Sequence, residues 1–181
     1  MSNISNYYQG FESERLLYRS LSLDDAESWQ HFFEDHDSLA YFELPSIEKD
    51  KLFMAKRWIR KQLTRYEQQH FGQLAMVRKE DGVLIGLAGF KYMEYKGTRY
   101  PEMMCVIKKS YRRQGYSTEA TIRFVRFAFD EQLTEKVLFT IHEKNVGSQR
   151  TLESLGFQKI DILTMPQRNV YIYEAVPTMI T

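Results

Sequence analysis

A short basic turn before a predicted helix holds the residues best suited to chemistry. Two arginines precede a glycine, and two hydroxyl residues fall in the first helical turn. Unpaired backbone N–H groups there carry the positive end of the helix dipole, and glycine lets a ligand approach closely. The pattern predicts a phosphate-type anion site, although a solvated basic turn before an ordinary helix would show the same spacing. The residues are Arg112, Arg113, Gln114, Gly115, Tyr116, Ser117 and Thr118.

A strand must lead into this turn and a helix must follow it. The apolar run at residues 102–107 predicts the strand, and a loop is expected before it at residues 96–101. Apolar residues at helical spacing predict a helix from Gly115 to about Gln132. The anion site would thus lie between a buried strand and a long helix.

The rest of the chain alternates between the same two patterns. Capping residues predict one helix from Ser22 to about His36 and a second helix that starts at Ser46. We therefore expect a mixed α/β domain over residues 1–181, in the order βααβββαβαββ, with residues 1–11 as a loosely held tail. The other predicted strands cover residues 14–21, 71–79, 83–95, 137–142, 157–164 and 170–176, and a short helix covers 145–155.

Composition narrows the class of protein. The 181 residues carry a net charge of +1, so no overall field points to nucleic acid or to a membrane surface. A single cysteine, Cys105, excludes an internal disulfide, and we expect a cytoplasmic protein because neither a leader nor a spanning apolar run is present. The spacing of the four histidines predicts no metal site.

Two blocks of sequence resemble the GNAT superfamily of acetyl-coenzyme A (acetyl-CoA) dependent N-acetyltransferases. The family signature is Arg or Gln, two residues, Gly, one residue, then Gly or Ala, and residues 112–117 match it except for Ser117. Residues 145–157, Glu102 and residues 14–19 are similar to the branch that contains the ribosomal-protein-alanine N-acetyltransferases. The resemblance implies a GNAT fold with splayed fourth and fifth strands.

The resemblance also implies roles for the cofactor-binding residues. Residues 112–118 would hold the pyrophosphate of acetyl-CoA mainly through backbone N–H groups. Cys105, Val106 and Ile107 would pair with the pantetheine arm, with N–H groups near Val106 polarising the thioester. Asn145 would hydrogen-bond the pantetheine. No metal is implied, and the protein would be a monomer or a homodimer.

Acetyl transfer needs a base for the amine and an acid for the leaving thiolate. Many family members use a tyrosine as the acid, but Leu152 stands at that position. In the ribosomal-protein branch a serine at the position of Ser148 takes that part, so the resemblance implies Ser148 as the candidate acid. Glu102 is the candidate base, directly or through water. Each has a structural alternative: a helix N-terminal hydroxyl for Ser148 and a strand-edge charge for Glu102. A packing role is expected for Cys105, because its sequence neighbours offer no activating histidine.

The acceptor is less well defined. An α-amine has a pKa of about 7.7 to 8.0 and a lysine amine about 10.4, so the neutral fraction at pH 7 differs a few hundredfold. We therefore expect a peptide or protein N-terminus, bound between residues 34–43 and 165–170. The alternatives are a small-molecule amine, such as an amino acid, polyamine or antibiotic, and a regulatory module that binds coenzyme A (CoA) without turnover.

Overall fold

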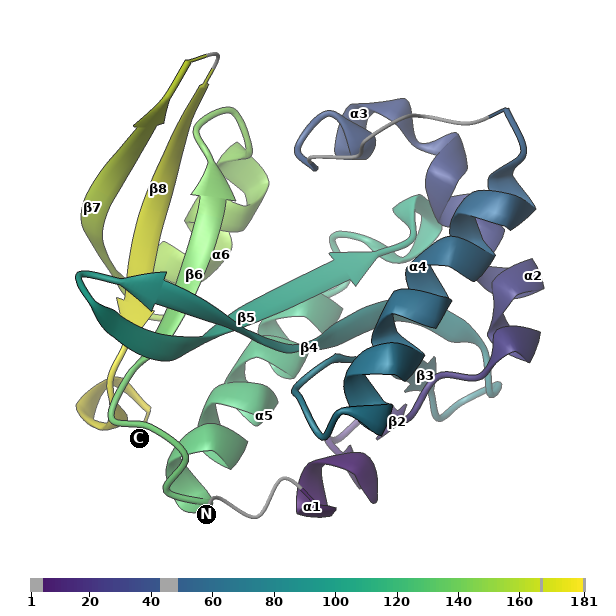
Figure 1. Cartoon of the computed structure of the whole chain (residues 1–181), viewed down its shortest axis with the longest axis horizontal. Helices are drawn as coiled ribbons and strands as arrows, with labels where there is room; N and C mark the ends of the chain where they lie inside the picture. Colours follow the sequence, from purple (N-terminus) through teal and green to yellow (C-terminus); the bar gives the residue numbers. More distant parts are fainter. Residues whose placement is uncertain (1–4, 43–48, 167, 181) are drawn as a thin grey trace.

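A mixed sheet in the order β1-β2-β3-β4-β5-β6-β8-β7 forms the centre of the fold (Figure 1). The computed structural model describes residues 5–42, 49–166 and 168–180, and the eight strands counted here are those of these ranges. The strands are β1 (Phe11–Glu12), β2 (Leu16–Arg19), β3 (Gln73–Arg78), β4 (Leu84–Tyr95), β5 (Thr98–Ile107), β6 (Val137–His142), β7 (Gln158–Met165) and β8 (Arg168–Ala175). The helices are α1 (Ser5–Tyr8), α2 (Ala26–Trp29), α3 (His36–Leu39), α4 (Lys51–Glu67), α5 (Tyr116–Asp130) and α6 (Val146–Ser154), with 3-10 turns η1 (Leu23–Asp25), η2 (Gln30–Glu34), η3 (Lys109–Tyr111) and η4 (Pro177–Met179).

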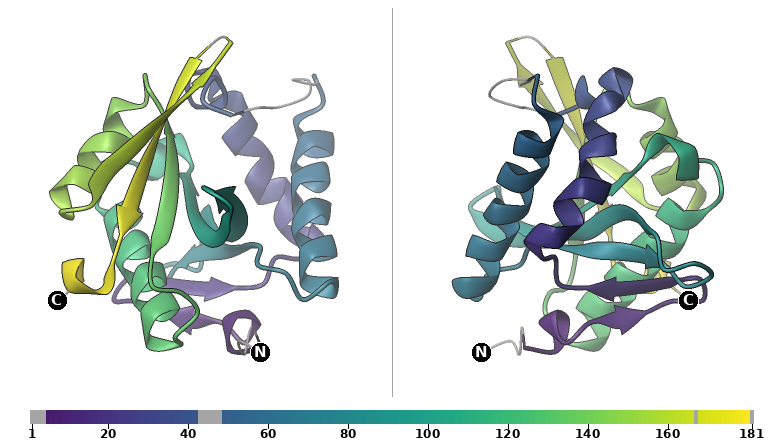
Figure 2. Two further views of the ribbon diagram at one scale, coloured as in Figure 1. Left: turned by 60° about the vertical axis from the view of Figure 1, so that its left-hand side comes forward. Right: turned by 90° about the vertical axis from the view of Figure 1, so that its right-hand side faces the viewer.

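Two hydrophobic clusters hold the helices on opposite faces of the sheet (Figures 1 and 2). On one face α5 buries Phe124 against Tyr18 and Phe90. On the other face α2 and α4 bury Trp29 and Ile59 over the same strands. Strand alternation places successive residues in different clusters, which is why β3 and β4 are apolar almost throughout.

The sheet opens between β5 and β6. These strands run parallel, and within the described residues they pair at Glu102 and Leu138 alone. Beyond that pair β5 turns away from β6, which leaves a V-shaped gap between residues 103–107 and the second half of β6 (Figure 1). In the predicted numbering these are the fourth and fifth strands, so the mixed α/β class and the splay between these two strands are both confirmed.

Three predicted elements differ from the structure. The loop expected at residues 96–101 is largely strand, because Lys96 and Gly97 form a two-residue turn with positive φ and β5 begins at Thr98. The helix expected from Ser22 to His36 is broken into η1, α2 and η2. The helix expected from Ser46 begins at Lys51, where the Asp50 side chain accepts from Phe53 N–H at 2.9 Å; Ser46 lies outside the described residues.

The expectation of a loosely held N-terminal tail is wrong for residues 5–11. Tyr7 is fully buried, its hydroxyl donates to Gly72 O at 2.5 Å and it accepts from Phe90 N–H at 3.2 Å. Gly89 has no side chain to occupy the space that this hydroxyl needs. The local sequence is mostly polar, and the pattern therefore did not indicate that Tyr7 packs in the core.

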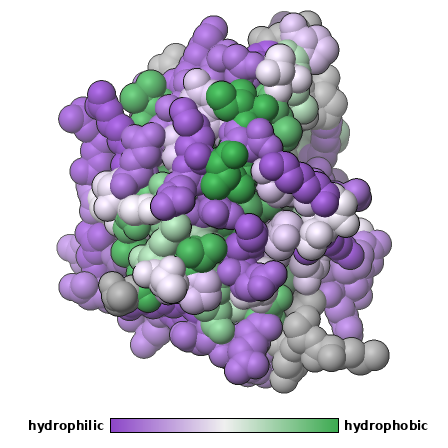
Figure 3. Space-filling view, turned by 90° about the vertical axis from the view of Figure 1, so that its left-hand side faces the viewer, coloured by the Kyte–Doolittle hydropathy of each residue, from purple (hydrophilic) through white to green (hydrophobic). Residues whose placement is uncertain are grey.

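The outer strand β7 lies on the side of the molecule shown in Figure 3, where apolar patches interrupt a hydrophilic surface. Its Ile162 and Met165 side chains are exposed.

None of the helices in the described ranges combines the length and the apolar character that crossing a bilayer would require.

Candidate active site

Two helix N-termini border the V-shaped gap. Because β5 and β6 are parallel, their carboxyl ends lie at the same edge of the sheet. The chain continues from β5 into α5 and from β6 into α6. Both helices therefore begin at the mouth of the gap, where ligands bind in many open sheets and where helix N-termini attract anions.

The turn before α5 has the backbone of an anion cradle. Arg113 and Gly115 both adopt left-handed conformations, with φ of 62° and 81°. The first hydrogen bond of α5 runs from Glu119 N–H to Gly115 O at 3.0 Å, so helix geometry leaves the N–H groups of residues 116–118 without a partner inside the helix. Right-handed and left-handed backbone conformations that alternate next to N–H groups form a concavity that binds anions. The residues of this turn fit a pyrophosphate.

The Arg112 side chain points back into the protein. Its Nε and Nη2 donate to Ile107 O at 3.0 and 2.9 Å, and its Nη1 lies 2.5 Å from the buried Asp35 carboxylate. This arginine of the signature therefore fixes the end of β5 and the course of the turn. Arg113 and Gln114 are exposed at the tip.

The edge of β5 offers backbone groups to the gap. Lys108 N–H bonds Ile85 O of β4, while Ile107 O faces Arg112 on the other side. The backbone N–H and C=O groups of successive residues point to opposite edges of a strand. Those of Cys105 and Ile107 therefore point toward the gap, and those of Val106 point toward β4. The N–H group predicted near Val106 for the thioester is therefore better placed on Cys105 or Ile107, and Val106 instead buries its side chain among α2 and α4.

The Cys105 thiol lies on the α5 side of the sheet, 3.8 Å from Met76 Sδ. Burial raises the pKa of this thiol to about 12, and a hydrogen bond with Ser117 lowers it only in part. Ser117, the residue that departs from the family signature, thus directs its hydroxyl toward the Cys105 thiol. A protonated thiol at neutral pH is a poor nucleophile, which agrees with a packing role.

The first turn of α6 carries Asn145 and Ser148. The Asn145 side-chain oxygen caps the helix by accepting from Ser148 N–H at 3.2 Å. This bond uses the amide oxygen only, so the amide NH₂ group keeps its two donors for a ligand in the gap. Ser148 is half-buried at the same mouth.

Glu102 lies at the closed end of the gap, at the pair that joins β5 to β6. The residue is 3% exposed, its carboxylate lies 3.2 Å from Lys91 Nζ, and it accepts a hydrogen bond from the Thr140 hydroxyl. The structure therefore places this carboxylate inside the sheet junction and holds it through two partners. Neither Lys91 nor Thr140 stood out in the sequence, because their contact depends on strand register.

The segment from Asp35 to Phe42 lies across the gap from α6 (Figure 1). Tyr41 contacts His142 at the end of β6, with ring centroids 5.5 Å apart, and Asp35 holds Arg112. The expected acceptor border at residues 34–43 is thus adjacent to the gap as far as it is described, since Glu43 lies outside the described residues. Within the described ranges no cluster of three His, Cys, Asp or Glu side chains could hold a metal ion.

Comparison with known proteins agrees with this geometry. Residues 15–158 match the family model described as acetyltransferase (GNAT) domain. The chain is 25% identical over 152 residues to the uncharacterized N-acetyltransferase YoaA of Bacillus subtilis, and the match covers 84% of each protein.

Two solved structures have the same fold. The ribosomal-protein-S5-alanine acetyltransferase of Vibrio fischeri has a TM-score of 0.75 at 15% identity, covering 95% of this chain and 98% of that one. The microcin C7 self-immunity acetyltransferase MccE, solved with acetyl-CoA and AMP, has a TM-score of 0.76 at 13% identity, covering 90% and 93%.

Proposed function

Because this chain belongs to the GNAT acetyltransferase family, whose members use acetyl-CoA, we propose that it acetylates the α-amine at the N-terminus of a peptide or protein. The observation that supports this most is the gap between β5 and β6, which has an anion cradle at its mouth and the Glu102 carboxylate at its closed end. A thioester bound along the edge of β5 would lie between these two groups.

The cofactor half of the proposal rests on backbone groups. The N–H groups of residues 115–118 would hold the pyrophosphate, supported by the exposed cation of Arg113 in the turn. The Cys105 backbone and the Ile107 N–H would pair with the pantetheine arm, and the Asn145 amide would donate to it from the opposite side. Arg112 supports the cradle from behind through Ile107 and Asp35.

The chemical half assigns one proton transfer to each side of the gap. Glu102, directly or through a water molecule, would take a proton from the acceptor amine. The amine nitrogen then forms a bond to the thioester carbonyl carbon, the C–S bond breaks, and the Ser148 hydroxyl would protonate the departing thiolate. An N–H group of Cys105 or Ile107 would stabilise the developing oxyanion.

The different pKa values of the candidate amines support an α-amine as the acceptor. A carboxylate that already interacts with Lys91 and Thr140 is better matched to an α-amine than to a lysine amine, because the α-amine is a few hundredfold more often neutral at pH 7. The border of the gap at residues 35–42 and the start of β8 would contact the peptide.

The test measures release of free thiol from acetyl-CoA with four sets of acceptors: peptides, amino acids, polyamines and aminoglycosides. We expect turnover on peptides with a free N-terminus and none on the same peptides with a blocked N-terminus. Turnover only on polyamines, aminoglycosides or lysine side chains would contradict the peptide proposal. Tight CoA binding without turnover on any acceptor would favour the regulatory module.

A further inference from the structure

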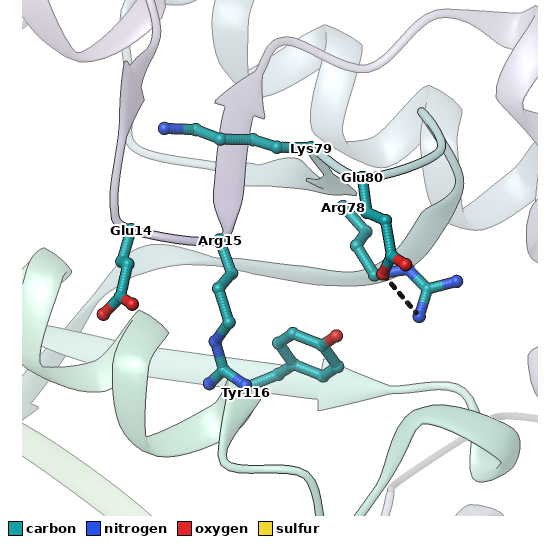
Figure 4. Close-up of a pocket in the computed structure, with 6 residues that line it drawn as sticks. All are labelled: Glu14, Arg15, Arg78, Lys79, Glu80 and Tyr116. Carbon is teal, nitrogen blue, oxygen red and sulfur yellow. Dashed lines mark ion pairs between the residues drawn. The ribbon is translucent and has the colours of Figure 1, made fainter.

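A second arginine, Arg15, contacts the anion cradle at residues that Arg112 does not contact. It precedes β2, far from the cradle in sequence, yet its Nη1 donates to Gln114 O at 2.9 Å. Its Nε lies 2.6 Å from Glu119 Oε2, in the first turn of α5. Figure 4 shows this side chain extending from the start of β2 to the ring of Tyr116.

The Glu119 carboxylate is fully engaged in this contact. Its second oxygen accepts from Arg15 N–H and from the Ser13 hydroxyl, both at 2.7 Å. Burial alone would raise the pKa of Glu119, but these hydrogen bonds outweigh burial and the pKa lies below its usual value. The ion pair is therefore present at neutral pH.

The bond to Gln114 O sets the direction of a cradle donor. A peptide unit is planar and trans, so its C=O and the next N–H point in opposite directions. Holding Gln114 O toward Arg15 turns the N–H of Gly115 away from Arg15. Arg113 and Gly115, which flank Gln114, both have positive φ, and a turn of this kind needs such external support.

The guanidinium also packs against the cradle. It lies 4.4 Å from the centroid of the Tyr116 ring, and a Cβ added to Gly115 would meet Arg15 Nη2 at 3.2 Å. Gly115 therefore leaves room for Arg15 as well as for a ligand.

We propose that Arg15 is a positioning residue of the pyrophosphate cradle, which orients the Gly115 N–H through Gln114 and anchors the first turn of α5 through Glu119. This inference rests on the proposed function, because it assumes that the cradle holds the pyrophosphate of acetyl-CoA. Arg15 itself acts through the backbone and needs no contact with the ligand.

The chain offers a matched control. Arg19, at the other end of β2, pairs with Asp25 at 2.7 Å in the same way, and the side chains are 43% and 9% exposed, compared with 42% and 14% for Arg15 and Glu119. Asp25 belongs to η1, which does not form the cradle. Losing either arginine should cost similar stability, and only Arg15 should affect the cradle.

The experiment measures the dissociation constant of CoA by calorimetry for the wild type, Arg15→Gln, Glu119→Gln and Arg19→Gln, at a temperature where all four are folded. We expect the constant to rise about tenfold or more in Arg15→Gln and Glu119→Gln, because charge-assisted hydrogen bonds to the ligand lose their orientation. It should stay within about twofold of the wild type in Arg19→Gln. Equal weakening in all three variants, or in none, would overturn the inference.

A second measurement separates orientation from general loosening. With S-acetylpantetheine, which lacks the pyrophosphate, kcat/KM of Arg15→Gln should equal that of the wild type, whereas with acetyl-CoA it should fall about tenfold. An equal fall with both donors would overturn the inference. Absence of CoA binding by the wild type would contradict the proposed function itself.

Discussion

Arg112 Nη1 lies 2.5 Å from Asp35 Oδ2, and this ion pair joins the turn before α5 to the segment at residues 35–42, which is the proposed border of the acceptor site. The two partners differ in exposure, since the Arg112 side chain is 32% exposed and that of Asp35 is 3% exposed. Removing one partner therefore has a different cost from removing the other.

We expect Arg112→Met to destabilise the protein by about 3 kcal/mol, because it leaves a buried carboxylate without its arginine. Asp35→Asn should cost about 1 to 2 kcal/mol, since the freed guanidinium can turn toward water. Urea unfolding would measure both free energies. Equal costs would show that burial of Asp35 does not govern the pair.

Ser148→Ala should lower kcat by about a hundredfold and leave the KM for acetyl-CoA nearly unchanged, if its hydroxyl protonates the thiolate. Ser154→Ala is the matched control, since this hydroxyl on the same helix donates to Thr151 O at 2.8 Å, inside α6. Steady-state kinetics on the preferred acceptor would compare the two. An unaltered kcat in Ser148→Ala would remove Ser148 as the acid.

Glu102→Gln should also lower kcat by about a hundredfold, because an amide cannot take the proton of the amine. Glu174→Gln provides the comparison, since Glu174 is a strand carboxylate 2.8 Å from Lys136 Nζ and has no assigned role. A similar loss in both variants would point to a structural effect of breaking a lysine–carboxylate pair.

The stability of the protein should depend on Lys108 between pH 8 and pH 10.5. Burial lowers the pKa of this lysine from its usual 10.5 to about 8, and its Nζ donates to Ser28 Oγ at 2.7 Å. Below pH 8 the folded protein contains a buried charge, and above pH 10.5 the lysine is neutral in both the folded and unfolded states. Since the unfolded state binds more protons in this window, the stability of the wild type relative to Lys108→Met should rise as the pH increases through it.

Chemical denaturation of both proteins at pH 7, 9 and 10.5 would measure that difference. Lys136→Met is a control of opposite sign, because the hydrogen bond with Glu174 raises the pKa of Lys136. The stability of the wild type relative to Lys136→Met should not rise between pH 8 and pH 10.5. A flat profile for Lys108→Met would show that the Lys108 ammonium is well solvated in the fold.

Cys105→Ala should retain kcat within about twofold, since direct transfer needs no cysteine nucleophile. With a thiol pKa of about 12, alkylation by iodoacetamide at pH 8 should be on the order of a thousandfold slower in the folded protein than in urea. Mass spectrometry would follow both reactions. Rapid alkylation of the folded protein, with loss of turnover in Cys105→Ala, would reopen a catalytic role for this thiol.

Local patterns in the sequence carried the elements and the cofactor turn. The apolar run at residues 102–107 predicted a strand, residues 112–118 predicted an anion cradle, and apolar spacing after Gly115 predicted a helix, because glycine geometry, helix dipoles and hydrophobic periodicity act over a few residues. The strands predicted at residues 71–79 and 83–95 and the two predicted terminal strands followed from equally local signals. The prediction of a loop at residues 96–101 was wrong. The twelve residues of β4 and the ten residues of β5 are joined by a turn of only two residues.

The amino-acid sequence by itself determined the family, most of the strands and helices along the chain, and the likeness of the cradle to a pyrophosphate site, since these depend on short sequence motifs and local patterns. Only the tertiary structure decided which side chains hold that cradle and the carboxylate at the closed end of the gap. Arg15 meets Gln114, Asp35 meets Arg112, and Lys91 and Thr140 meet Glu102 across strand register and between elements. Such contacts arise when the packed sheet brings distant segments together, so no local pattern contains them.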